Sequence, residues 1–303
     1  GPTWRIQARR AVQNPNNKMI EYRGATLRFG PVPVLYAPYF SHPDPTAGRR
    51  SGLLTPDAGQ NRRLGAQLEI PYYWAMSDSQ DLTLTPQLFS KVNPILKTRY
   101  RKRFWSGQMQ LDPVFGWDQD FDDKGKFGDE TFRGSIFGTG NFEINDYWRW
   151  GFGLERASDD LFLRRYEVSG AGRKRGPFVG DISRLISQLW TTGQDENSYA
   201  NLSFISFQGL RASDESNTLP LVLPVGEVER VLRDPVLDGQ IRLQASTANL
   251  RRDLNREASR VSGGAKWRLD RVIGPGLMVS PFADTAKGRV PRMPTTPPQL
   301  RLP

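Results

Sequence analysis

Two prolines bracket a strand-like stretch of this chain, and this arrangement limits the folds that it can adopt. Pro56 and Pro71 flank the segment 63–70, which reads as a β-strand. Central strands avoid proline because its missing N–H removes a hydrogen bond from the ladder. We therefore expect this strand to lie at a weakened edge of a sheet. A weak seam in a closed sheet would let a molecule leave through its side.

The composition favours β-structure and excludes a helical membrane protein. The 303 residues include 29 Gly and 23 Pro, and 11% are aromatic, which is a turn-rich and β-prone mixture. No apolar run approaches the ~18 residues that a membrane-spanning helix needs. A membrane β-barrel stays possible, because its strands need only about ten residues of weak alternation.

Alternation and turn signals predict many antiparallel strands. Near the N-terminus, two sets of residues alternate with polar ones, as expected for the end of a small half-buried sheet: Trp4, Ile6 and Ala8, and then Ala25, Leu27 and Phe29. From about residue 62 onward, the chain reads as strands joined by short turns and longer loops, an organisation typical of outer-membrane barrels. The expected strands are 63–70, 80–90, 95–105, 107–117, 132–144, 147–157, 161–168, 185–192, 198–208, 239–250, 259–270 and 276–283. Aromatic residues gather at several strand ends, which fits either a membrane girdle or a β-sandwich core.

The residues needed for catalysis or metal binding are scarce. The chain has no cysteine, and its only histidine, His42, lies in a proline-rich stretch. No nucleophile elbow, phosphate loop or dinucleotide fingerprint is present. The acidic run 118–123 lacks the spacing and the closing glutamate of a calcium loop. We predict no catalytic residue, no metal and no cofactor, and we expect that the protein is not an enzyme.

The net charge of +10 indicates a basic surface or lumen that meets phosphate groups. Arg99, Arg101 and Arg103 alternate with other residues and share one face of an expected strand. They are candidates for lumen or phosphate contacts, although a water-filled polar lumen would also explain them. The run 173–175 lies between glycines and reads as a solvated loop.

Four segments are specific enough to indicate a family: PVPVLYAPYFSHP at 31–43, RRSGLLTP at 49–56, IPYYWAM at 70–76 and DLTLTPQLFS at 81–90. On these segments, the chain resembles the LptD (Imp/OstA) family of outer-membrane lipopolysaccharide-assembly proteins. Weaker matches continue in order to about residue 284. No nucleic-acid partner is expected.

The resemblance implies an all-β chain with three parts. Residues 1–45 would be the C-terminal end of a periplasmic β-jellyroll. Residues 46–284 would be the N-terminal portion of a large antiparallel transmembrane β-barrel, with about 12 of roughly twice as many strands. Residues 285–303 do not match, and we expect a disordered or frame-disrupted tail. We therefore expect a partial sequence.

The resemblance also implies a function and a set of sites. Family members insert lipopolysaccharide into the outer leaflet through a lateral gate between the first and last barrel strands. Pro56 and Pro71 correspond to the gate prolines. Candidates for an acyl-chain groove are Trp4, Ile6, Leu27 and Phe29, which would serve equally well as ordinary core residues.

The implied partners are lipopolysaccharide, an LptE-type plug lipoprotein and a periplasmic LptA-type bridge protein. The implied location is the cell outer membrane, with the N-terminal part in the periplasm. Many relatives join the two parts by disulfides, and a chain without cysteine cannot do so. Two alternatives remain open at this point: a general outer-membrane channel or receptor barrel, and a soluble β-sandwich that binds polyanions.

Overall fold

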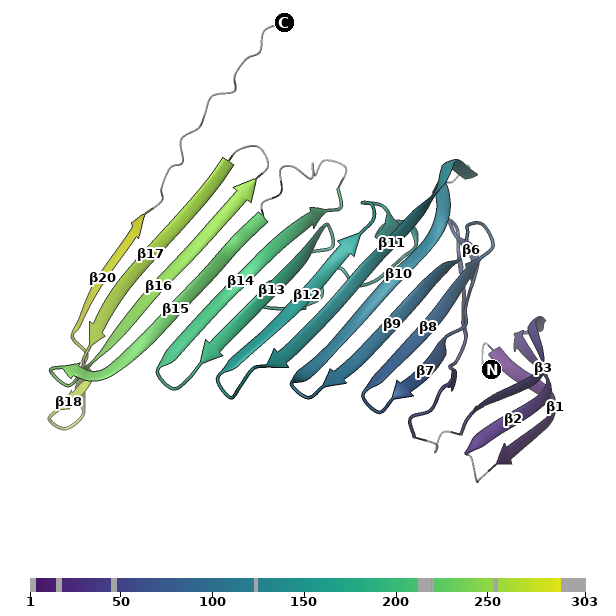
Figure 1. The fold of residues 1–303 in the computed structure, drawn as a ribbon, viewed down its shortest axis with the longest axis horizontal. Coiled ribbons are helices and arrows are strands. Elements are labelled where there is room, and N and C mark those ends of the chain that lie inside the picture. Colours follow the sequence, from purple (N-terminus) through teal and green to yellow (C-terminus); the bar gives the residue numbers. More distant parts are fainter. Residues whose placement is uncertain are drawn as a thin grey trace, which may run out of the picture. The chain divides into compact units, whose positions relative to one another are not determined.

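The computed structural model consists of β-strands almost throughout (Figure 1). It describes residues 4–14, 18–44, 48–122, 125–211, 219, 221–252 and 256–289. Within this part of the chain, the only helix, α1 (Phe162–Arg165), has four residues, and no helix is long and apolar enough to cross a membrane. All the strand pairs are antiparallel, so the predicted all-β fold class is confirmed.

The strands of the described residues are the following: β1 (Trp4–Asn14), β2 (Met19–Phe29), β3 (Val32–Pro43), β4 (Gly52–Leu53), β5 (Asp57–Asn61), β6 (Gly65–Glu69), β7 (Tyr72–Ser77), β8 (Gln80–Phe89), β9 (Ile95–Phe104), β10 (Gly107–Asp122), β11 (Gly125–Glu143), β12 (Trp148–Ala157), β13 (Arg184–Gln194), β14 (Ser198–Gly209), β15 (Leu221–Val236), β16 (Gly239–Arg252), β17 (Arg256–Arg268), β18 (Arg271–Ile273), β19 (Leu277–Val279) and β20 (Phe282–Arg289).

The chain divides into two compact units. Unit 1 consists of residues 1–104, 110–136 and 164–168, and unit 2 consists of residues 105–109, 137–163 and 169–303. The long strands β10 and β11 contribute residues to both units.

A three-stranded sheet forms the N-terminal part of unit 1, in the order β1-β2-β3 (purple in Figure 1). Its strands pair without interruption from Trp4↔Phe29 to Asn14↔Met19 along β1 and β2, apart from Arg9. Gly30 turns the chain into β3 with φ of +55°, a conformation that glycine adopts without steric penalty. Ala25 and Leu27 are buried, as the predicted alternation requires.

The rest of unit 1 is a larger antiparallel sheet. Its hydrogen-bonded order is β11-β10-β9-β8-β6-β5, and β7 pairs with both β8 and β4. β5 ends this order and forms the edge. The expectation that the strand within 63–70 lies at the edge is wrong, because β6 pairs with β5 on one side and with β8 on the other. Unit 2 continues the same strand pattern in the order β20-β17-β16-β15-β14-β13-β12-β11.

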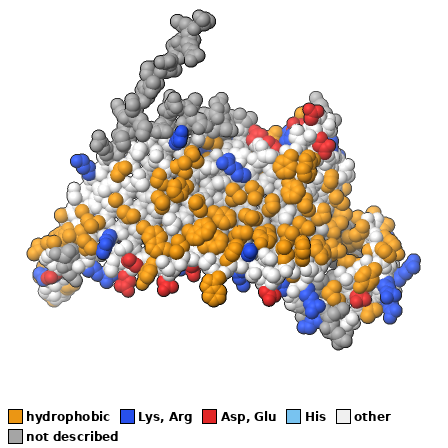
Figure 2. Space-filling model, in the orientation of Figure 1, with side chains coloured by type: hydrophobic (Ala, Val, Ile, Leu, Met, Phe, Trp, Pro, Cys, Tyr) orange, Lys and Arg blue, Asp and Glu red, His pale blue; other side chains and the backbone are white. Residues whose placement is uncertain are grey.

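The strands of unit 2 have one polar and one apolar face. On the polar face, cross-strand partners are Tyr199↔Glu229, Glu229↔Gln244 and Ser246↔Ser262. On the other face, Val228 lies opposite Ala200 and Ala245, and Val228 and Val261 are each 53% exposed. Figure 2 shows one face on which hydrophobic side chains gather over the strands and charged side chains gather mostly near the turns. An exposed apolar face of this extent marks contact with a membrane or another apolar surface.

Three sequence-based expectations about the strands need correction. Segment 161–168 is not a strand: it contains α1 and a turn, because Phe162 and Leu163 are buried on consecutive positions instead of alternating. β15 was missed, because the prolines in and beside it hide a long alternating run. β20 extends to Arg289 and pairs with β17, so strand structure continues beyond residue 284. The predicted tail from residue 290 onward lies outside the described residues.

The number of long strands agrees with the expected count of about 12. Two long strands are each broken into two short ones by a proline: β4 and β5 follow one another along the first, and β6 and β7 along the second. With each broken strand counted once, thirteen long strands follow residue 46 in the part of the chain that the structure describes. β18 and β19 form a separate small hairpin.

Candidate functional site

The first hairpin of the larger sheet in unit 1 is interrupted at the two prolines. Residues 52–77 form this broken hairpin, with β4 and β5 in its first arm and β6 and β7 in its second. β4 pairs only with β7, and β5 pairs only with β6. Pro56 lies between the two strands of the first arm, and Pro71 lies between those of the second. The prolines therefore flank the β5–β6 hairpin, and not one strand as the sequence indicated.

Few backbone hydrogen bonds cross the broken hairpin at the interruption. β4 has only two residues, Gly52 and Leu53, in register with β7. The N–H of Leu54 then donates to the carbonyl oxygen of Pro71 at 2.8 Å. Neither proline has an N–H to donate, so the two ladders cannot join across this point. The edge is consequently held by two short ladders in place of one long one.

An apolar pocket of about 220 Å³ opens beside this interruption, within unit 1. The N-terminal sheet and the broken hairpin both contribute to its walls. The lining residues are Ile6, Ala25, Leu27, Leu35, Ala37, Phe40, Leu53, Leu54, Thr55, Pro56 and Ile70. No lining side chain carries a charge, so the pocket suits a hydrocarbon group.

The structure brings together some of the residues that the sequence singled out. Ile6, Leu27 and Pro56 line the apolar pocket, whereas Pro71 does not. Trp4 and Phe29 are backbone partners in the N-terminal sheet, but their side chains lie outside the described part of the structure. The contributions of β3 and of segment 53–55 were missed. The alternation of Leu35 and Ala37 was the available signal for β3.

The predicted arginines of β9 lie on one face, and two of them bind carboxylates. Arg99 Nε donates to Asp112 at 2.7 Å, and Arg101 Nε donates to Asp81 at 2.9 Å. Both guanidinium groups remain about half exposed. Arg103 is exposed, and no ion pair of it is found among the described residues. These cations are thus available to anionic groups at the surface, although Arg99 and Arg101 are partly neutralised.

Asp81 also binds a residue that the sequence analysis did not single out. Arg49, in the linker between the N-terminal sheet and β4, donates to Asp81 Oδ2 at 2.7 Å and to the Tyr73 hydroxyl at 2.7 Å. A further N–H group of Arg49 donates to the carbonyl oxygen of Asp78. The Asp81 side chain is only 8% exposed, so this arrangement places a nearly buried carboxylate between two arginines.

The long connection between β12 and β13 folds onto a face of the strands instead of extending into solvent. In unit 1, the buried hydroxyl of Tyr166 donates to Asp118 at 2.8 Å, and the ring packs against Phe89 and Phe121. Burial, together with the hydrogen bond to Asp118, raises the pKa of Tyr166, so the phenol stays a donor. Asp118, in an expected acidic loop, is instead part of β10.

We expect Tyr166→Phe to destabilise unit 1 by about 1 to 2 kcal/mol, because it removes one donor from a buried carboxylate. In this variant, Asp118 still accepts hydrogen bonds from Lys126 Nζ at 2.8 Å and from the N–H of Asn93 at 3.0 Å. The carboxylate therefore loses only one of its donors. Denaturant unfolding of the full-length protein would measure the change. A match between the variant and the unchanged protein would show that this hydrogen bond contributes nothing to stability.

The connection between β12 and β13 is also held to the strands in unit 2, through Arg175. Arg175 pairs with Glu155, which is 1% exposed and also accepts the N–H of Ile186 at 3.2 Å. The guanidinium group lies 4.7 Å from the centre of the Phe137 ring. Gly153 leaves room for the connection, since a Cβ there would lie 2.6 Å from the Arg175 carbonyl oxygen. The expectation that 173–175 is a solvated loop is therefore wrong for Arg175.

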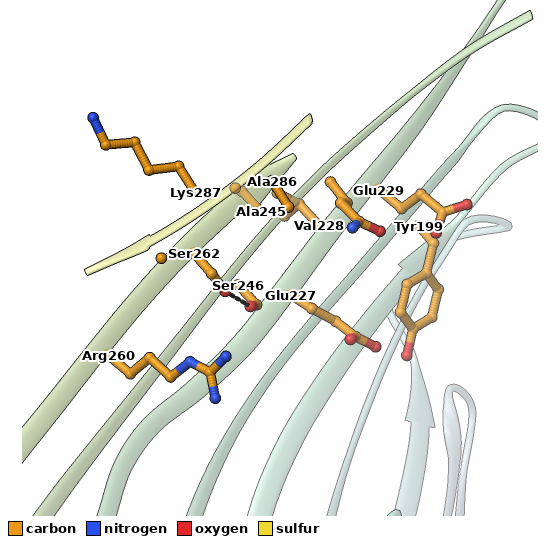
Figure 3. A pocket seen from close by; sticks show the side chains of 13 residues that line it. Tyr199, Glu227, Val228, Glu229, Ala245, Ser246, Arg260, Ser262, Ala286 and Lys287 are labelled. Carbon is orange, nitrogen blue, oxygen red and sulfur yellow. Dashed lines mark hydrogen bonds between the residues drawn. The ribbon is translucent and has the colours of Figure 1, made fainter. Parts of the chain in front are cut away.

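A polar pocket of about 420 Å³ lies over strands β14 to β17 and β20 of unit 2 (Figure 3). Tyr199, Glu227 and Arg260 contribute polar groups to it, and the hydroxyls of Ser246 and Ser262 are 2.7 Å apart. In the described residues, no three His, Cys, Asp or Glu side chains gather as a metal site. The pocket is a polar surface that can bind hydroxyl-rich groups or water.

Aromatic side chains line the short-turn ends of the strands in both units. In unit 1, Trp74 and Phe104 are exposed near the turns that follow β7 and β9. In unit 2, Tyr147 lies in the β11–β12 turn, Trp148 begins β12, and Trp105 is fully exposed. Tyr and Trp gather in this way where strands meet a membrane–water interface.

Two family profiles match most of the chain. The profile described as "LPS transport system D" matches residues 131–286, and the profile described as "LptD protein" matches residues 21–127. The first alone covers more than half of the chain.

Individual relatives agree with the profiles. The LPS-assembly protein LptD of Albidiferax ferrireducens is 30% identical over 222 residues, which are 70% of this chain and 26% of that protein. The LPS-assembly protein LptD of Xanthomonas oryzae pv. oryzae is 28% identical over 72% of this chain, and that of Escherichia coli is 25% identical over 54%. The chain spans about a quarter of the length of these relatives.

Proposed function

The chain belongs to the LptD family, and from this premise we propose that it forms part of a translocon that inserts lipopolysaccharide into the outer leaflet of the outer membrane. The observation that carries the proposal is the apolar pocket beside the broken hairpin. A pocket without charged groups accepts acyl chains, and a weakly paired edge next to it gives them a way out.

The broken hairpin is the proposed first side of a lateral gate. Pro56 lines the pocket, and the carbonyl oxygen of Pro71 accepts a backbone hydrogen bond from Leu54 between the two ladders. The last barrel strand would form the other side of the gate. Each unmade hydrogen bond lowers the free energy of opening by about 1 kcal/mol.

The sugar and phosphate groups of the substrate would follow the polar face. In unit 1, Arg99, Arg101 and Arg103 share one face of β9 and supply half-exposed or exposed cations there. An LptE-type lipoprotein is the proposed plug and an LptA-type protein the proposed bridge to the N-terminal sheet. We place residues 1–45 in the periplasm and residues 46–284 in the outer membrane, and we propose a transport function without a chemical step.

The exposed apolar face argues against the soluble β-sandwich alternative. Val228 and Val261 point away from the polar partners of unit 2 and are half exposed. A soluble sandwich would bury such a face between its two sheets. The protein should therefore need detergent for purification.

Replacing both gate prolines by alanine should slow lipopolysaccharide transport by about three- to tenfold. An added N–H group can extend the ladders by one hydrogen bond, and its net value of about 1 kcal/mol corresponds to about a fivefold change in rate. The measurement is the rate at which newly made lipopolysaccharide reaches the cell surface, with the full-length variant as the only copy. Pro94→Ala, outside the broken hairpin, is the matched control. Normal transport by the double variant, together with normal folding, would count heavily against the gate.

A further inference from the structure

One arginine joins the linker after the N-terminal sheet to two strands of the larger sheet. Arg49 donates to acceptors on β7, on the β7–β8 turn and on β8: the Tyr73 hydroxyl, the Asp78 carbonyl oxygen and the Asp81 carboxylate. All three contacts lie within unit 1. A guanidinium group can reach three such acceptors at once, because its five N–H groups point in fixed directions.

The segment that begins four residues after Arg49 forms one wall of the apolar pocket. Leu53 and Leu54 line the pocket, and Leu53 lies opposite Tyr72, the neighbour of Tyr73. The opposite wall comes from Ile6, Leu27 and other residues of the N-terminal sheet. The Arg49 contacts therefore lie where the chain passes from one wall to the other.

Backbone pairing alone holds this segment weakly. β4 contributes only two residues to its ladder. Ser51 Oγ accepts one hydrogen bond from the N–H of Ala75 at 2.9 Å, and the N–H of Leu54 donates one to Pro71 at 2.8 Å. The three contacts of Arg49 are thus a large part of what fixes the linker to the sheet.

We propose that Arg49 is a positioning residue that holds the linker, and with it one wall of the apolar pocket, in a fixed orientation to the larger sheet. The relevance of this role to transport rests on the proposed function, whereas the holding of the linker rests on the hydrogen bonds of Arg49 alone. Asp81 keeps its two-point contact with Arg101 when Arg49 is removed, at 2.9 and 3.2 Å. Loss of Arg49 therefore loosens the linker without leaving a buried carboxylate unpaired.

The test measures the orientation directly with a pair of spin labels. This chain has no cysteine, so Gln7→Cys in β1 and Leu88→Cys in β8 give two defined label sites in the full-length protein, once any cysteine elsewhere is replaced. Gln7 is exposed and Leu88 is 44% exposed, so neither label has to enter the core. Pulsed electron–electron double resonance then gives the distribution of distances between the label on the N-terminal sheet and the label on the larger sheet. The measurement is made without lipopolysaccharide.

Arg49→Gln should widen this distribution by about twofold, because a hinge that loses its fixed contacts samples more orientations. Arg49→Lys should widen it as well, since one ammonium group cannot serve three divergent acceptors. Tyr73→Phe, which removes one acceptor, should give an intermediate width. Arg63→Gln removes the same charge from an exposed turn and should leave the width unchanged.

An unchanged width in Arg49→Gln would overturn the proposal. An equal widening in Arg63→Gln would also overturn it, because the effect would then come from net charge. Because the substrate is absent, the result is independent of lipopolysaccharide transport. A wider distribution with normal transport in the double proline variant would support the role of Arg49 while contradicting the proposed gate.

Discussion

Replacing Leu54 by aspartate should lower lipopolysaccharide transport at least about tenfold while the protein still folds. Leu54 lines the apolar pocket and is 47% exposed, so a carboxylate there can stay hydrated when the pocket is empty. An acyl chain that enters must strip water from this charge, at a free energy of several kcal/mol, and 1.4 kcal/mol already corresponds to a factor of ten. Surface arrival of pulse-labelled lipopolysaccharide gives the rate.

The matched control for this variant is Val12→Asp. Val12 lies in β1, is 41% exposed and does not line the pocket, so the same change of side chain should leave transport within about twofold of normal. The thermal midpoint of each variant separates a loss of transport from a loss of folding. Normal transport by a folded Leu54→Asp variant would remove the pocket from the path of the acyl chains.

Replacing Arg175 by methionine should release the long connection between β12 and β13 in unit 2. Glu155 would then be a buried carboxylate without its cation, and breaking such a pair destabilises a protein by about 3–5 kcal/mol. The rate of tryptic cleavage within 169–183 should rise by about a hundredfold or more, since each 1.4 kcal/mol is a factor of ten. Limited proteolysis of the full-length protein measures it.

Two further variants make this prediction specific. Lys174→Met removes the same charge from an exposed neighbour and should leave the cleavage rate within about twofold. In the double variant Glu155→Gln/Arg175→Met, no buried charge remains, and the amide oxygen can still accept the N–H of Ile186. The double variant should therefore recover much of the protection. If it is cleaved as fast as Arg175→Met, the buried charge is not the cause.

The class of fold could be predicted from local patterns, but the pairing of the first hairpin could not. Alternation in segments such as 239–250 gave the strands, because a sheet with one polar and one apolar face imposes a period of two. The prolines at 56 and 71 mark the break between the two ladders, but the strand β6 between them is paired on both sides and is not the edge strand. The register of the strands beside these prolines depends on which partner strands the rest of the chain supplies. No local sequence pattern contains that information.

Residues of the candidate site could be predicted where their role follows from the alternation of their own strand. They could not be predicted where their role depends on a partner that is distant in the sequence. Ile6 and Leu27 were identified from alternation, and they line the pocket. Arg49 and Arg175 were not, because each lies in a connection whose sequence is typical of a solvated loop. Their acceptors lie 32 and 20 positions away, and only the folded sheet brings the partners together.

The broken hairpin limits how many backbone hydrogen bonds of the edge would have to break at the same time. A continuous ladder separates cooperatively, so a long stretch of unpaired backbone would face lipid during any opening, where each unpaired group is unfavourable by several kcal/mol. The ladders on either side of Pro56 are separate, so the proposed gate could release β4 from β7 while β5 stays paired with β6. At such a segmented edge, the proposed opening over the pocket would proceed in steps. Each step would leave only a few backbone groups unpaired at one time.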